Sequence, residues 1–218
     1  MAVSGLIMLG YLLVHMYGNL KFFQGQEKFD SYLSGLDDIL YPYLPHEGAL
    51  WILRVVLTVA LVVHVYAAIT LWRRNKAAAG YVGGTRYHSK QNKTGVQRSY
   101  ASFTMRWGGI ILLLFIIGHI AQMLPNRLSP GGASDSKYER VVNGFEEWWV
   151  VLLYTIGLVA VGFHLAHGFW SALQTLGRTH SATRRSSRVT TVAIGLAVLI
   201  SGGFLTVPFA VFFFGAGS

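Results

Sequence analysis

Long apolar runs alternate with polar segments along this chain of 218 residues. Five of the runs reach or approach the roughly 20 residues that a helix needs to cross a bilayer. They cover residues 1–20, 48–72, 107–124, 148–176 and 189–214. The first has neither a basic start nor a small-residue cleavage site, which argues against a signal peptide. The pattern predicts an all-α integral membrane protein, with a four-helix bundle plus a fifth helix in a single domain, 1–218.

Charge is sparse and unevenly placed. Charged residues make up 12% of the chain and hydrophobic residues 53%, whereas a soluble domain carries about 25% charged residues. Residues 73–106 hold eight basic and no acidic side chains, and residues 175–190 hold four basic and none acidic. The positive-inside rule places these two basic segments in the cytoplasm, with the N-terminus inside and the C-terminus outside. Membrane topology therefore accounts for the net charge of +9 without nucleic acid.

The absence of cysteine limits the chemistry. The chain cannot form disulfides, hold an iron–sulfur cluster through thiolates, or attach a c-type haem covalently. A redox centre held here must therefore be bound non-covalently, through histidine or oxygen ligands.

Five of the eight histidines fall inside the predicted spans, and four spans carry at least one. A titratable ring in hydrocarbon is costly, so it suggests a function by default. A single such ring would serve equally well as a hydrogen-bond partner between helices, but one in each of four spans points to ligands. The five are His15, His64, His119, His164 and His167. The other three lie in loops and are expected to be ordinary solvated side chains: His46, His88 and His180.

Residue counting sorts four of these histidines by depth. His15 and His119 each lie six residues before the outer end of their run, about 9 Å from that edge. His64 and His164 each lie 17 residues after an outer glutamate, about 25 Å from it. The counts predict an outer pair, His15 and His119, and an inner pair, His64 and His164. Each pair would hold one haem iron between two helices of the bundle, with the irons roughly 15 Å apart.

His167 leaves the inner pair open to a second interpretation. It lies three residues after His164, so it could replace that residue as ligand or bond a haem propionate; depth matching favours His164. Small residues beside the histidines would make room for a porphyrin, or would simply let helices pack closely. They are Gly18, Ala67, Ala68 and Gly168.

The run Phe163-His164-Leu165-Ala166-His167-Gly168-Phe169-Trp170 resembles a haem-ligand segment of the cytochrome b anchors of succinate:quinone oxidoreductases. The run His15-Met16-Tyr17-Gly18-Asn19-Leu20 is similar to the first-helix ligand segment of that family. Nearly the whole chain resembles the single-subunit type with five helices and two haems. The resemblance implies that His64 and His164 hold a proximal haem b and that His15 and His119 hold a distal haem b. It also favours His164 over His167, because the family's ligand stands four residues before the glycine.

The resemblance implies partners as well. A flavoprotein subunit would oxidise succinate, and an iron–sulfur subunit would pass the electrons to this non-catalytic anchor, where menaquinone is reduced. Both subunits would dock on the cytoplasmic face, at residues 73–106 and 175–190. The expected location is a bacterial plasma membrane.

Candidates for quinone and proton chemistry lie near both faces. His46 and Glu47 stand at the outer start of the second run, although Glu47 could instead be an interfacial carboxylate favoured by the helix dipole. Arg54, within the second run, should either pair with a distal haem propionate or snorkel to the interface. A second group would frame an inner site or hold propionates: Arg106, Trp107, His88 and Tyr100.

Two other functions fit parts of the pattern. The first is the cytochrome b anchor of another quinone-linked enzyme, such as a hydrogenase, a formate dehydrogenase or a fumarate reductase. The second is a transporter that uses its histidines as a proton relay. Apart from Pro208 the apolar runs are unbroken, which disfavours a transporter built on paired interrupted helices.

Overall fold

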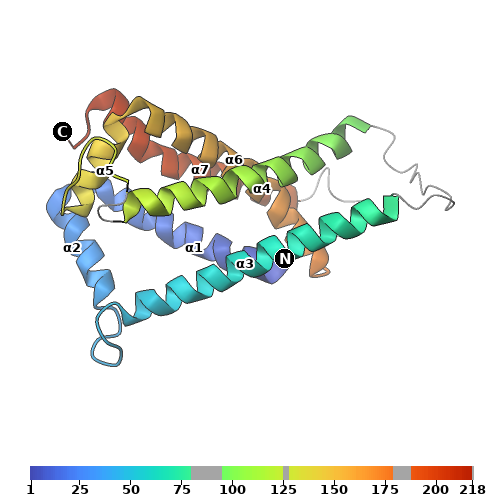
Figure 1. The fold of residues 1–218 in the computed structure, drawn as a ribbon, viewed down its shortest axis with the longest axis horizontal. Helices are drawn as coiled ribbons and strands as arrows, with labels where there is room; N and C mark the ends of the chain where they lie inside the picture. Colours follow the sequence, from blue (N-terminus) through green and yellow to red (C-terminus); the bar gives the residue numbers. More distant parts are fainter. Residues whose placement is uncertain (80–94, 125–127, 179–187, 218) are drawn as a thin grey trace.

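The structure is a computed structural model that describes residues 1–79, 95–124, 128–178 and 188–217 (Figure 1). His88, His180 and part of each basic segment, residues 80–94 and 179–187, lie outside these ranges. Every regular element in the described part is a helix. In chain order they are α1 (Ala2–Leu20), η1 (Lys21–Gln24), α2 (Gln26–Asp37), α3 (Gly48–Ala79), α4 (Gly95–Met123), α5 (Lys137–Glu146), α6 (Trp148–Thr175) and α7 (Arg188–Phe214).

Five helices of the described part are long and apolar enough to cross a membrane, as the sequence predicted. They cover Ala2–Gln24, Gly48–Asn75, Thr104–Met123, Trp148–Thr175 and Arg188–Phe214. Two helices run further than their apolar cores, because α3 continues to Ala79 and α4 begins at Gly95. The prediction of an all-α integral membrane protein with five spans is confirmed.

The four histidine-bearing helices are α1, α3, α4 and α6. α6 packs against α1 and α4, and α3 packs against α1. α7 lies along α1 and α6 as the fifth helix (Figure 1). α3 turns only one stripe toward the bundle, in which Ala60 is buried and Leu57, Leu61 and His64 are half-buried. Most of its other apolar side chains are exposed, as expected of a helix that faces lipid.

Two short helices, α2 and α5, cross one end of the bundle and were not predicted. α5 begins at the cap residue Ser136, whose hydroxyl accepts a hydrogen bond from the backbone N–H of Glu139 (3.3 Å). Such a bond satisfies one of the free N–H groups of a first turn. The helix buries Tyr138, Val141 and Phe145 on one face, a spacing typical of an amphipathic helix.

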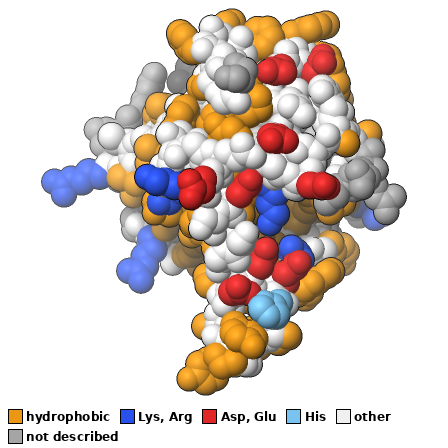
Figure 2. Space-filling view, turned by 90° about the vertical axis from the view of Figure 1, so that its left-hand side faces the viewer, with side chains coloured by type: hydrophobic (Ala, Val, Ile, Leu, Met, Phe, Trp, Pro, Cys, Tyr) orange, Lys and Arg blue, Asp and Glu red, His pale blue; other side chains and the backbone are white. Residues whose placement is uncertain are grey.

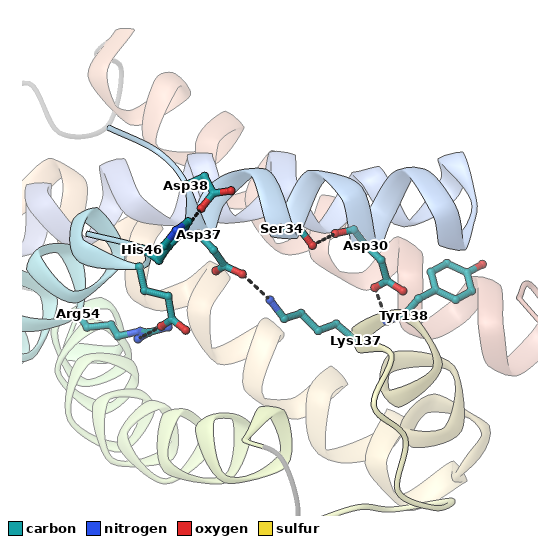
Figure 3. Close-up of polar contacts among 9 residues, drawn as sticks. Asp30, Ser34, Asp37, Asp38, His46, Arg54, Lys137 and Tyr138 are labelled. Carbon is teal, nitrogen blue, oxygen red and sulfur yellow. Dashed lines mark hydrogen bonds and ion pairs between the residues drawn. The ribbon is translucent and has the colours of Figure 1, made fainter. Parts of the chain in front are cut away.

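These two helices are fastened to each other. The Asp30 carboxylate of α2 accepts from the Ser136 hydroxyl (2.8 Å) and from the Tyr138 backbone N–H (3.2 Å), as Figure 3 shows for Tyr138. Beneath them the ring of Phe22 stacks on that of Tyr138 at 4.6 Å. A further ion pair joins Lys137 to Asp37 at 3.6 Å. α2 and α5 therefore form one polar cap over an aromatic core.

All nine acidic residues of the chain lie in residues 27–47 and 135–147. Figure 2 looks onto this end of the molecule, where acidic side chains are spread across the face. We call the end formed by residues 26–47 and 135–147, which include α2 and α5, the acidic end. The topology prediction places it outside the cytoplasm.

Candidate functional site

The outer pair of histidines meets between α1 and α4. The rings of His15 and His119 have centroids 5.9 Å apart and planes inclined by 74°. Aromatic side chains surround them. Tyr11 stacks on His15 at 5.3 Å, Phe204 of α7 lies 5.4 Å from His15, and Phe115 lies 6.0 Å from His119. The pair thus lies in an apolar, aromatic setting that limits access of water.

The inner pair meets between α3 and α6. The rings of His64 and His164 have centroids 6.1 Å apart and planes inclined by 57°. Two glycines lie beside them: a Cβ added at Gly5 would lie 3.5 Å from the His64 ring, and one at Gly109 would lie 3.9 Å from the His164 ring. The backbones of α1 and α4 therefore approach these rings closely.

Two of the four rings are oriented by a hydroxyl from a neighbouring helix. The Tyr154 hydroxyl lies 2.9 Å from Nδ1 of His119, and the Ser4 hydroxyl lies 3.3 Å from Nδ1 of His64. Nδ1 of His164 is buried without a hydrogen-bond partner among the described residues. A bond at Nδ1 fixes the tautomer and leaves Nε2 as the metal-binding nitrogen. These hydroxyls are therefore the partners that would hold His119 and His64 in place as ligands.

The separation of the two pairs can be read on three helices. The inner pair lies beside α1 at Gly5, ten residues before His15. It lies beside α4 at Gly109, ten residues before His119. On α6, Tyr154 contacts the outer pair and stands ten residues before His164. Ten residues of α-helix rise about 15 Å, which agrees with the separation expected from the sequence.

His167 lies elsewhere on α6. Its Nδ1 lies 3.0 Å from the carbonyl oxygen of Phe163, one turn back on the same helix. The ring contact across to His64 is made by His164. The structure therefore brings the depth-matched histidine next to its expected partner.

The distance between the two rings of each pair is compatible with one metal between them. Metal–imidazole bonds of about 2.0–2.1 Å, with about 1.1 Å from nitrogen to ring centre, put the two centroids about 6 Å apart across one metal. The measured separations are 5.9 and 6.1 Å. Among the described residues no three metal-binding side chains converge. Two protein ligands suit a haem iron, because the porphyrin supplies the other four.

The candidates at the outer start of the second span lie at the surface of the acidic end (Figure 3). His46 hydrogen-bonds the Asp38 carboxylate and stacks on Tyr41 at 4.8 Å. Arg54 donates to the Glu47 carboxylate at 2.9 Å. Arg54 therefore has a carboxylate partner in Glu47, and the described ion pairs of His46, Glu47 and Arg54 stay within this surface group.

The candidates for the inner site and the small residues beside the histidines have different surroundings. Arg106 and Trp107 are exposed on α4, and the positions of His88 and of the Tyr100 side chain lie outside the described part. Of the small residues, Gly168 has open space beside it, whereas a Cβ at Gly18 would lie 3.3 Å from the Tyr32 ring of α2. Gly18 therefore accommodates α2.

Sequence reasoning missed Ser4, Gly5, Gly109 and Tyr154. Tyr154 and Ser4 are polar residues in apolar runs, and their depths match those of the histidines that they contact. This match in depth could have singled out both residues. It does not reveal which helices are neighbours, so the contacts themselves could not be predicted.

Comparisons with known proteins agree with this arrangement. The sequence profile described as "Succinate dehydrogenase/Fumarate reductase transmembrane subunit" matches residues 86–213. A Bacillus subtilis protein, "Succinate dehydrogenase cytochrome b558 subunit", is 24% identical over 191 residues, which cover 87% of this chain and 83% of that protein. No solved structure matches the chain significantly. The chain therefore belongs to the succinate dehydrogenase/fumarate reductase transmembrane subunits, as a membrane-anchor cytochrome b.

Proposed function

We propose that this chain passes electrons from an iron–sulfur subunit through two b haems to menaquinone. His64 and His164 would hold the inner, proximal haem, and His15 and His119 the outer, distal haem. The observation that carries the proposal is the pairing of four histidines from four helices, with ring separations of 5.9 and 6.1 Å at two depths. Each bound haem would supply a one-electron redox centre.

The protein's own contribution is to bind and orient. Tyr154 and Ser4 bond Nδ1 of one histidine in each pair, which turns Nε2 toward the neighbouring helix. Tyr11, Phe115 and Phe204 keep water from the outer pair. Helical rise fixes the two sites about 15 Å apart.

The direction of transfer rests on topology. The basic segments 73–106 and 175–190 belong on the cytoplasmic side by the positive-inside rule. The flavoprotein and iron–sulfur subunits would dock there, next to the inner pair. The expected location is a bacterial plasma membrane with the N-terminus in the cytoplasm.

Quinone reduction also needs protons, and we propose the acidic end as their source. His46 and Glu47 are the titratable groups at the outer start of α3, and each has a charged neighbour, Asp38 and Arg54. Their exposure allows proton exchange with bulk water, and Glu47 directly precedes α3, about two turns before Arg54.

Haem content tests the proposal. The purified chain should give two haems b by the pyridine haemochrome assay, with a bis-histidine reduced-minus-oxidised spectrum. A count of zero would refute haem binding, and a count of one would refute the two-site arrangement. His167→Ala should keep both haems; loss of the inner haem there, with its retention in His164→Ala, would reassign the ligand.

A further inference from the structure

Two buried donors lie together where α4 ends beneath α5. Gln122 is only 9% exposed, and its Nε2 has no hydrogen-bond partner among the described residues. Nε of Arg140 is likewise buried and unpartnered within the described part of the chain. Burying such groups without an acceptor is costly, most of all for a guanidinium. The two side chains therefore call for an acceptor that the described polypeptide does not supply.

The two donors lie close to each other. Nη1 of Arg140 donates to the carbonyl of Met123, the residue after Gln122, at 3.3 Å. The Gln122 amide lies against Gly144, where an added Cβ would come within 2.5 Å of Nε2. Arg140 and Gly144 are four residues apart on α5, so they share one face, about one turn apart. Consecutive residues of α4 thus meet one face of α5.

Arg140 forms no ion pair among the described residues, although this end of the molecule is rich in carboxylates. The acidic end carries all nine carboxylates of the chain (Figure 2). The described ion pairs there join Asp38 to His46, Glu47 to Arg54, and Asp37 to Lys137. None of them involves Arg140, whose bonded nitrogen is turned inward to the end of α4.

The outer histidine pair lies directly below. Gln122 follows His119 by three residues, a rise of about 4.5 Å along α4. Phe145, next to Gly144, packs edge-on against Tyr154 at 4.8 Å, and Tyr154 contacts His119. α5 therefore covers the outer pair, with the two donors at its edge.

We propose that Arg140 and Gln122 bind a propionate carboxylate of the outer haem. The inference rests on the proposed function, which puts a haem between His15 and His119. A carboxylate offers the acceptor that both donors lack, and guanidinium–carboxylate bonds are among the strong ones. The pair would act as a positioning and tuning group: it anchors the macrocycle, and its positive charge favours the reduced iron.

The test compares variants of the whole subunit with its haems bound. Arg140→Gln should lower the midpoint potential of the outer haem and leave that of the inner haem unchanged. Arg140→Lys should restore most of the shift, because the charge returns. Gln122→Met keeps the volume and the net charge, so it should raise the rate of outer-haem transfer to apomyoglobin by about tenfold, the scale typical of a lost outer-shell contact, with little change in potential.

Lys137→Gln is the matched control. It removes one positive charge from the same helix, but Lys137 is exposed and pairs with Asp37, so neither haem should respond. Because Arg140 also bonds the end of α4, loosened packing alone could speed haem loss; it would not produce a downward potential shift that lysine restores.

Three results would overturn the inference. The first is an unchanged outer-haem potential in Arg140→Gln together with unchanged transfer in Gln122→Met. The second is an equal shift of both haems. The third is a raised KM for quinone with normal haem properties, which would make a quinone carbonyl the acceptor. Absence of an outer haem from the unmodified chain would instead refute the proposed function, and the haem count separates that failure from these.

Discussion

Replacing Tyr154 by phenylalanine isolates a single hydrogen bond at the outer site. The Tyr154 ring is buried, and Phe115 and Phe145 pack on it at 5.1 and 4.8 Å. Those contacts survive in Tyr154→Phe, so the fold should be kept. The hydroxyl 2.9 Å from Nδ1 of His119 is what disappears.

The size of the effect follows from that bond. With a haem iron on Nε2 of His119, Nδ1–H would donate to the Tyr154 oxygen, which would make the imidazole a stronger donor to the metal and favour the oxidised state. A buried hydrogen bond is worth about 0.5–1.5 kcal/mol net. If the whole of that free energy acted on one oxidation state only, the midpoint potential of the outer haem would change by about 20–65 mV. This is the largest shift that the lost bond can cause. The outer-haem potential should therefore rise, within that limit.

The assay is a potentiometric titration of the reduced-minus-oxidised spectrum, resolved into two components. Tyr11→Phe is the matched control, because Tyr11 stacks on His15 in the same site without a hydrogen bond to either histidine of the outer pair. It should leave both potentials close to their starting values. A shift of the inner component in Tyr154→Phe, or equal shifts in both variants, would refute the reasoning.

Three further changes probe the surroundings of the two pairs. Gly5→Leu should displace His64 and release the inner haem, because a Cβ added there would lie only 3.5 Å from the His64 ring. Gly10→Leu is the control, because a Cβ added there would meet nothing within 4 Å, and equal haem counts in the two variants would contradict the contact. Asp30→Ala should weaken the attachment of α5 by about 1–2 kcal/mol, seen as a lower temperature for loss of the outer haem, whereas Asp38→Ala should leave that temperature unchanged. Glu47→Gln breaks a half-exposed ion pair, so the free energy of unfolding should change by less than about 1 kcal/mol. Quinone reduction should slow, while haem content and succinate–dye activity stay normal. An unchanged rate of quinone reduction would show that Glu47 is only an interfacial residue.

Hydrophobicity was enough to predict the spans, because the bilayer sets their length. Depth counting was enough to sort the histidines, because helical rise is constant. The short helices α2 and α5 were missed, since they lie in polar segments too short to span. Their signals were present in α5: Ser136 three residues before Glu139, and Tyr138, Val141, Val142 and Phe145 at helical spacing.

The contacts that complete the site could not be read from the chain. Ser4 reaches a histidine 60 residues away, and Tyr154 reaches one 35 residues away. Arg54 was expected to meet a haem propionate or to snorkel, and in the structure it pairs with Glu47, seven residues earlier. Such pairings depend on which helices become neighbours and on how each is rotated, and neither follows from hydrophobic periodicity.

The assignment of four ligands to two haems is tested most directly by replacing each histidine in turn by alanine and titrating the haems that remain. His15→Ala and His119→Ala should both lose the same spectral component, and His64→Ala and His164→Ala should both lose the other. Sorting into any other two pairs, or retention of both components in any one of the four variants, would contradict the account.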